Sequence, residues 1–244
     1  MLQQTQASRV EPSFRSFVRR FPSVRALAAS DRADVLRAWV GLGYNRRAVW
    51  LHRAARSVVE EHGGRVPADP ASLRTLPGVG PYTAAAVASI AAGVPIAAID
   101  VNVRRIVTRV SGLGDRVAVE AEAQAWVDRS APGEWNQALM DLGRMHCRAV
   151  PRCDGCPLAA WCTWRLSGGP ADVGAARPQG RFEGSLRQVR GSVVAELRRT
   201  PSAGRTRLAA AAGATPDRLG LALDGLVADG VVERRGRSFR LATG

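Results

Sequence analysis

The chain has 244 residues, 46% of them hydrophobic, which is enough for one large domain or two small ones around a buried core. Its formal net charge is +14 and its pI is about 11.4. A chain this basic usually binds a polyanion, and nucleic acid is the first candidate. All 35 basic residues are arginine, so a GC-rich genome is an alternative explanation for part of the charge.

Membrane-directed functions are excluded on two grounds. No run of about 18 apolar residues is free of charge, so no transmembrane helix is expected. The first residues lack the basic and apolar regions of a signal peptide. We therefore expect no membrane partner and a cytoplasmic, nucleoid-associated, bacterial-type location.

Residues 1–165 are predicted to form a run of helices. Apolar residues recur there at spacings of three and four, as one face of an amphipathic helix requires. Asp31 is a candidate N-cap for one of these helices. The clearest expected helices span residues 46–61, 83–92, 101–110, 120–127 and 135–145.

The end of the chain differs in composition. Residues 167–182 are rich in Gly, Pro and Ala and are predicted to be a linker. Beyond them, helices are expected over 186–199, 206–212 and 216–229, and strands over 231–233 and 238–241. Three helices followed by a hairpin are typical of a winged-helix-like α+β module.

The segment from Leu76 to Ala84 carries the first motif, LPGVGPYTA. Glycine permits a tight turn and lets a bare backbone approach a phosphate. The N–H groups that open the following helix would face the same anion. We therefore expect phosphate binding rather than a simple turn, by the residues Gly78, Val79, Gly80 and Thr83.

Asp100 precedes another expected helix, in the stretch IDVNVRR. Capping that helix is the structural explanation for an Asp at this position. The functional explanation is a carboxylate beside a sugar whose glycosidic bond breaks through a cationic state. The two roles are compatible, and we expect both.

The chain's four cysteines lie within 16 consecutive positions, which favours a metal site over disulfides. Only one pair has the CxxC spacing, whereas a zinc ribbon usually has two such pairs. A 4Fe-4S cluster is the first expectation, with zinc or unligated cysteines as alternatives. The expected ligands are Cys147, Cys153, Cys156 and Cys162.

Together these motifs resemble the adenine-DNA glycosylase (MutY) family, within the helix–hairpin–helix glycosylases that hold an iron–sulfur cluster. The resemblance covers residues 1–165 almost continuously and includes MLQQTQ at residues 1–6 and GLGY at residues 41–44. It implies a mainly α fold: a helix–hairpin–helix domain over 1–146, a cluster loop over 147–166, the linker over 167–182, and the winged-helix-like module over 183–244. The first two cysteines are separated by five residues, one fewer than is usual in the family.

The resemblance also implies site residues. Asp100, Tyr82 and Asn102 match the catalytic region, and Tyr82 stands where bifunctional relatives carry a nucleophilic Lys. Gln4 and Tyr44 match residues that contact DNA, Gln4 by inserting into the base stack. Asn45 replaces a second Tyr found in many members.

The implied function is base excision repair: a monofunctional glycosylase that flips out mispaired adenine, opposite 8-oxoguanine or guanine, and hydrolyses its N-glycosidic bond. The sequence contains no Lys, so water rather than a Schiff-base amine is the expected nucleophile. The expected partner is double-stranded DNA with a mismatch or an oxidised base, bound by a monomer.

The family's general acid, a Glu, aligns two residues before Met1, so the resemblance implies a chain truncated at its N-terminus, whose own activity is in question. Two alternatives follow. The enzyme could act on another mismatched base, thymine or uracil, or the protein could bind damaged DNA without catalysis.

Overall fold

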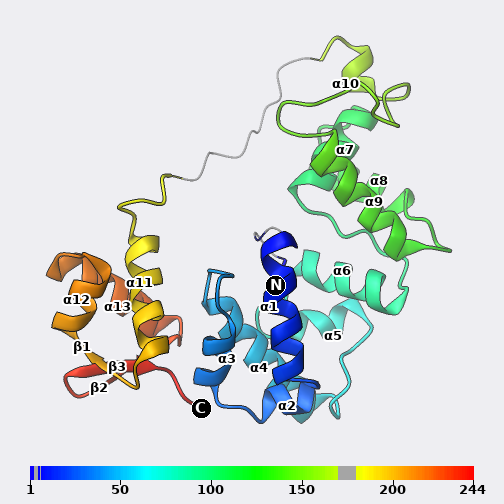
Figure 1. The fold of residues 1–244 in the computed structure, drawn as a ribbon. Coiled ribbons are helices and arrows are strands. Elements are labelled where there is room, and N and C mark those ends of the chain that lie inside the picture. Colours follow the sequence, from blue (N-terminus) through cyan, green and yellow to red (C-terminus); the bar gives the residue numbers. More distant parts are fainter. Residues whose placement is uncertain (3–4, 6, 170–179) are drawn as a thin grey trace. The chain divides into compact units, whose positions relative to one another are not determined.

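The computed structural model describes residues 1–2, 5, 7–169 and 180–244, and these residues are mainly helical (Figure 1). The chain divides into two compact units. Unit 1 joins Met1–Arg65 to Pro178–Gly244, and unit 2 is Val66–Arg177. No helix in the described part of the chain is long and apolar enough to cross a membrane.

Unit 1 combines helices from the start of the chain with a small α+β module from its end. The described elements of the first segment are α1 (Ala7–Arg20), α2 (Val24–Ala28), α3 (Arg32–Ala38) and α4 (Arg46–Glu61). Those of the second are α11 (Leu186–Arg199), β1 (Ala203–Gly204), α12 (Arg205–Ala212), α13 (Pro216–Ala228), β2 (Val232–Arg235) and β3 (Ser238–Leu241).

The described residues of unit 2 form helices and connecting segments, and no strand. Its elements are α5 (Pro70–Thr75), α6 (Pro81–Ala92), α7 (Val101–Ser111), α8 (Arg116–Ala125), α9 (Pro132–Met145) and α10 (Thr163–Leu166). The apolar core of this unit is formed mainly by α7, α8 and α9, through residues such as Ile106, Val119 and Leu142. The cysteine segment packs against this core, because Cys147 and Cys156 contact it.

The expected helices are confirmed, and their ends show what sets each boundary. The helix expected over 46–61 is α4 without change. Pro81 and Pro132 extend α6 and α9 upstream, since proline is compatible with the first helical turn. The helix expected over 120–127 begins four residues earlier, at Arg116, where Asp115 accepts a hydrogen bond from the Ala118 N–H at 2.8 Å.

The C-terminal module has the winged-helix-like order of elements that the sequence predicts. Its three strands form one antiparallel sheet in the order β1-β3-β2. Ala203 pairs with Phe239 in the β1–β3 register, and Arg235 pairs with Ser238 where the hairpin closes. The strand β1 has only two residues, too few for an alternating pattern to reveal it in the sequence.

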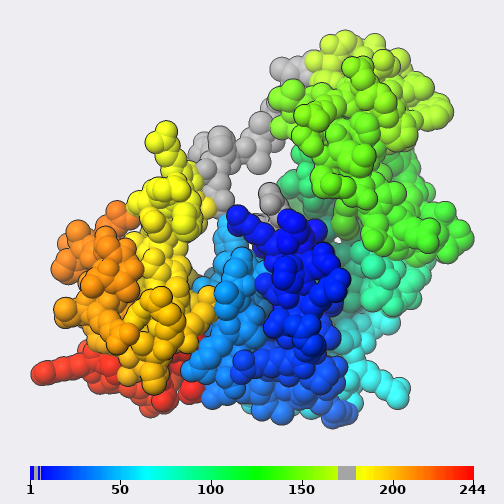
Figure 2. Space-filling view, viewed as in Figure 1, coloured from blue at the N-terminus to red at the C-terminus, as the bar shows by residue number. Residues whose placement is uncertain are grey.

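This module shares its core with the first helices of the chain. Val193 and Leu197 of α11 belong to one buried cluster with Leu36 and Trp39. Figure 2 shows the C-terminal residues, yellow to red, lying directly against the lighter blue residues that include α3. Packing therefore groups the module with residues 1–65, a relation that composition along the chain does not reveal. The predicted domain limits stay a prediction.

Arg198 secures this contact. It donates hydrogen bonds at 3.0 Å to the backbone carbonyls of Leu36 and Trp39 and to the side-chain oxygen of Asn45. A second link joins Arg46 to Asp229, which also pairs with Arg190. Arg198 and Arg190 thus make contacts within unit 1.

Candidate active site

The turn between α5 and α6 is built as the glycine motif predicts. Gly78 has a φ of +78°, a conformation that favours glycine. Gly80 is the N-cap of α6 without a side chain to cap it, and a Cβ added there would meet no atom within 4 Å. Gly78 and Gly80 are exposed, so the backbone at the start of α6 is open to an anion.

Asp100 caps α7, as the structural explanation requires. Its Oδ1 accepts hydrogen bonds from the N–H groups of Asn102 and Val103, both at 2.8 Å. Its Oδ2 accepts a third bond, from the side-chain amide of Asn102, also at 2.8 Å. These three hydrogen bonds fix the direction of the carboxylate. Because Asp100 is only half-buried, the carboxylate remains accessible to a substrate.

Asn102 is oriented in turn by Arg105. The Arg105 guanidinium donates to the Asn102 side-chain oxygen at 2.8 Å and to the backbone carbonyl of Cys147 at 2.7 Å. On the other side, a Cβ on Gly143 of α9 would lie only 3.0 Å from the Asn102 Cβ. Asn102 is thus held beside Asp100 by contacts from α7 and α9, and its predicted catalytic role stays a prediction.

Tyr82 lies on α6 within the electrostatic range of Asp100. Burial, and then the negative charge of Asp100, raise the pKa of the Tyr82 hydroxyl above its ordinary value of 10.0. The hydroxyl lies 3.6 Å from the sulfur of Met140. Tyr82 therefore stays neutral at physiological pH and keeps a dipole near the carboxylate.

The segment between α6 and Asp100 is held by buried amides. Asn136 of α9 is 1% exposed, and its side-chain oxygen accepts the Ala98 N–H at 2.7 Å. Its side-chain nitrogen lies at 2.7 Å from the Ser89 hydroxyl and at 2.9 Å from the Ile96 carbonyl. Gln124 of α8 accepts the Ala97 N–H at 3.1 Å. The position of Asp100 thus depends on α8 and α9.

The four cysteines line one small cavity of about 30 Å³. Burial, and then the charges of Cys162 and Cys156, raise the pKa of the Cys153 thiol. Among the residues that the structure describes, no group of three or more His, Cys, Asp or Glu side chains is placed to hold a single metal ion. The four thiols thus border one common space.

Two arginines of α7 contact the cysteine segment, and the sequence analysis missed both; Arg105 also bonds Asn102. Besides Arg105, Arg109 is 2% exposed and donates to the Cys147 sulfur at 3.4 Å and to the Arg148 carbonyl at 2.7 Å. Asn102, Arg105 and Arg109 follow one another at spacings of three and four, so they share one face of the helix. That spacing was the available signal.

The remaining predicted site residues belong to unit 1. Tyr44 is 45% exposed and has a φ of +43°, which is unusual for a residue other than glycine. Gly41 and Gly43 beside it also have positive φ values, and the Gly43 carbonyl accepts the Trp39 indole N–H at 3.1 Å. This turn holds Tyr44 outward. Gln4 lies outside the described residues.

The chain matches the model of the HhH-GPD superfamily base excision DNA repair proteins over residues 1–129. The chain belongs to this family. It is 43% identical to the adenine DNA glycosylase of Mycolicibacterium smegmatis over 242 residues, covering 96% of this chain and 82% of that one. The human adenine DNA glycosylase is 40% identical over 174 residues, which cover 68% of this chain and 32% of the human one.

Solved structures support the same family. A thermostable thymine-DNA glycosylase superposes with a TM-score of 0.63 at 28% identity, covering 68% of this chain and 80% of that one. A trapped endonuclease III–DNA covalent intermediate gives a TM-score of 0.60 at 25% identity, with coverage of 68% and 81%. The predicted helix–hairpin–helix glycosylase fold is thus confirmed.

Proposed function

We propose that this protein is a monofunctional DNA N-glycosylase that removes mispaired adenine, opposite 8-oxoguanine or guanine, from double-stranded DNA. The similarity to adenine DNA glycosylases carries the substrate assignment, since identity reaches 45% over 206 residues with the enzyme of Mycobacterium tuberculosis. The thymine-DNA glycosylase is less similar, at 28% identity. Adenine is therefore favoured over thymine or uracil.

The oriented carboxylate of Asp100 carries the chemical assignment. An adenine nucleotide must leave the base stack before its glycosidic bond can be reached. As the bond from C1′ to the base breaks, the electron pair leaves with the base and the sugar becomes cationic. A carboxylate held by three hydrogen bonds stabilises that charge without reorganising. A catalytically inactive, binding-only protein is less favoured because this arrangement is intact.

The other site residues have supporting roles. The exposed backbone of Gly78 and Gly80 binds a phosphate of the substrate strand. Neutral Tyr82 presents its dipole to the reacting sugar beside Asp100. Water then adds to C1′ and loses a proton while the departing base gains one, which completes hydrolysis. Because the sequence has no Lys, no side-chain Schiff base forms and the strand stays uncut.

A base-release assay tests this function. Duplexes with adenine opposite 8-oxoguanine, adenine opposite guanine, and thymine or uracil opposite guanine are incubated with excess protein. We expect free adenine from the first two, an abasic site in an uncut strand, and no covalent adduct on borohydride treatment. Release of thymine or uracil instead of adenine would replace the proposed substrate. Specific binding without release of any base would favour a non-catalytic protein.

We further propose that the four cysteines hold a 4Fe-4S cluster. The four described cysteines line one cavity, and their spacing contains a single CxxC pair, whereas a zinc ribbon usually has two. A cluster binds each thiolate at a different iron. The buried guanidinium of Arg109 beside Cys147 suits its negative charge. When bound, the cluster supplies structural cross-linking of the segment after α9.

The cofactor proposal predicts the effect of removing one ligand. Cys153→Ser should lower bound iron and acid-labile sulfide well below one cluster per chain, with loss of visible absorption, since three thiolates hold a cluster poorly. Total metal analysis checks this result, and wild type should contain four irons and no stoichiometric zinc. His146→Gln, a change at a neighbouring residue outside the thiol set, is the matched control. One zinc per chain in the wild type would contradict the assignment.

A further inference from the structure

The β2–β3 hairpin of the C-terminal module ends in a cluster of arginines. Arg234, Arg235 and Arg237 are exposed and surround Gly236, whose φ of +59° makes the turn tight. The hairpin, red in Figures 1 and 2, projects from the edge of the module. Such a tip can enter or follow a groove that a flat surface cannot reach.

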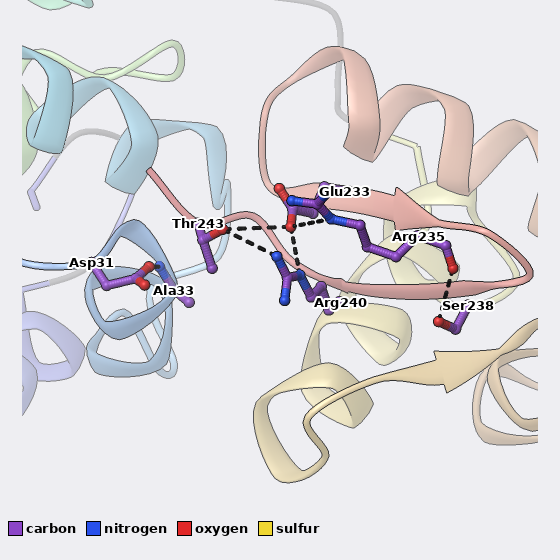
Figure 3. A network of polar contacts seen from close by, with 7 residues as sticks. All are labelled: Asp31, Ala33, Glu233, Arg235, Ser238, Arg240 and Thr243. Atoms are coloured by element: carbon purple, nitrogen blue, oxygen red, sulfur yellow. Dashed lines mark hydrogen bonds and ion pairs between the residues drawn. The ribbon is translucent and has the colours of Figure 1, made fainter.

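Most of this positive charge is not neutralised within the hairpin. Glu233 is the only acidic residue between residues 232 and 241. It accepts hydrogen bonds from Arg240 at 2.5 Å and from Arg235 at 3.3 Å, as Figure 3 shows. Arg234 reaches only the backbone carbonyl of Gly236, at 3.0 Å. Arg237 forms no hydrogen bond or ion pair with the other described residues.

The neighbouring start of α12 adds to the same surface. Gly204, its N-cap, has no side chain to cap the helix and pairs with Ser238 of β3. The guanidinium of Arg205 lies 5.6 Å from the centre of the Phe239 ring, so this arginine also lies beside the hairpin. Uncapped N–H groups and a further arginine thus extend the anion-binding character of the tip.

The outward face of α13 has the opposite character. Its exposed residues include Asp217 and Asp224 and the apolar Leu221, which is 63% exposed. The exposed arginine of this helix, Arg218, donates a hydrogen bond to the Gly184 carbonyl. Carboxylates and apolar groups do not bind phosphate, so this helix does not suit insertion into a DNA groove. The hairpin rather than the helix is therefore the part of the module that fits nucleic acid.

We propose that the β2–β3 hairpin is a second DNA contact, in which Arg234, Arg235 and Arg237 bind backbone phosphates of the duplex. The contact is independent of sequence and of damage, because the tip offers guanidinium groups and no arrangement for reading base edges. It adds affinity for DNA whether or not the bound duplex carries a lesion. The inference holds for whichever base the enzyme excises.

Salt-dependent binding to an undamaged duplex tests this contact on the full chain. The variant R234Q/R235Q/R237Q should bind at least about tenfold more weakly at low salt. The slope of log affinity against log salt should become shallower by about 0.9 for each lost phosphate contact. The matched control is R181Q/R187Q/R218Q, which removes the same charge from exposed or carbonyl-bonded arginines elsewhere in unit 1.

The hairpin proposal is supported if the control loses less than about twofold in affinity and keeps its slope. Equal losses of affinity in both variants would show that only net charge matters and would overturn the proposal. A hairpin variant that binds the duplex like wild type would overturn it too. The single variant R237Q separates the loss of a DNA contact from misfolding, because Arg237 has no hydrogen-bond or ion-pair partner among the described residues. It should keep the wild-type melting temperature and still lower the slope by about 0.9; an unchanged slope contradicts the contact.

Discussion

Replacing Asp100 with Asn is expected to lower the single-turnover rate of adenine release by about 10³-fold. Asn is as good an N-cap as Asp, so its side-chain oxygen can still accept the N–H groups of Asn102 and Val103. The substitution therefore removes the negative charge while it keeps the start of α7. The loss follows because the cationic sugar is no longer opposed by a carboxylate. Single-turnover kinetics with excess protein measure it.

Asp115→Asn is the matched control for this result. Asp115 caps α8 in the same unit, through one hydrogen bond to the Ala118 N–H at 2.8 Å, and forms no part of the proposed site. We expect it to keep wild-type release. Asp100→Asn should also retain its affinity for the duplex. If Asp100→Asn released adenine at the wild-type rate, its role would be capping alone.

Asn136→Ala is expected to lower the free energy of unfolding by about 3 kcal/mol. The substitution leaves buried partners unsatisfied, the Ala98 N–H and the Ile96 carbonyl among them, and each costs free energy because water does not replace the lost bond. Urea denaturation with an unchanged m-value measures the loss. Gln137→Ala removes an exposed amide from the next position of α9 and should change stability by less than about 0.5 kcal/mol.

The same substitution should also slow adenine release under conditions where the protein stays folded. Asn136 holds the backbone two residues before Asp100, so its loss should displace the carboxylate. Affinity for the duplex should change little, since the glycine turn before α6 is untouched. A variant that is destabilised but fully active would show that Asn136 stabilises the fold without positioning the site.

The sequence was sufficient to predict the local features of the site. Apolar periodicity predicted α4, α6, α7 and α9, and the Asp100 cap marked the start of α7. The starts of α6 and α9, at Pro81 and Pro132, lie upstream of the predicted ones. The glycine turn and the Asp100 cap follow from residue types whose backbone preferences are strong. The resemblance then supplied the chemical roles, which spacing alone could not.

Long-range contacts could not be predicted in this way. The hydrogen bonds of Arg198 to α3 span about 160 residues, and no local pattern distinguishes this arginine from the exposed Arg199 beside it. The roles of Arg105, Arg109 and Asn136 likewise depend on which carbonyl groups the fold brings near them. Burial of a polar side chain depends on tertiary structure. A single sequence predicts it only where helical spacing places the residue on a face shared with other site residues.

Affinity for a cationic sugar analogue tests the central claim, that the Asp100 carboxylate stabilises a positively charged sugar. A duplex with a pyrrolidine nitrogen at the abasic sugar carries that charge, and a tetrahydrofuran duplex has the same shape without it. Analogues of a transition state bind far more tightly than neutral mimics. We predict that wild type prefers the cationic duplex by at least about 100-fold and that Asp100→Asn loses most of this preference. An equal preference in both proteins would contradict the account.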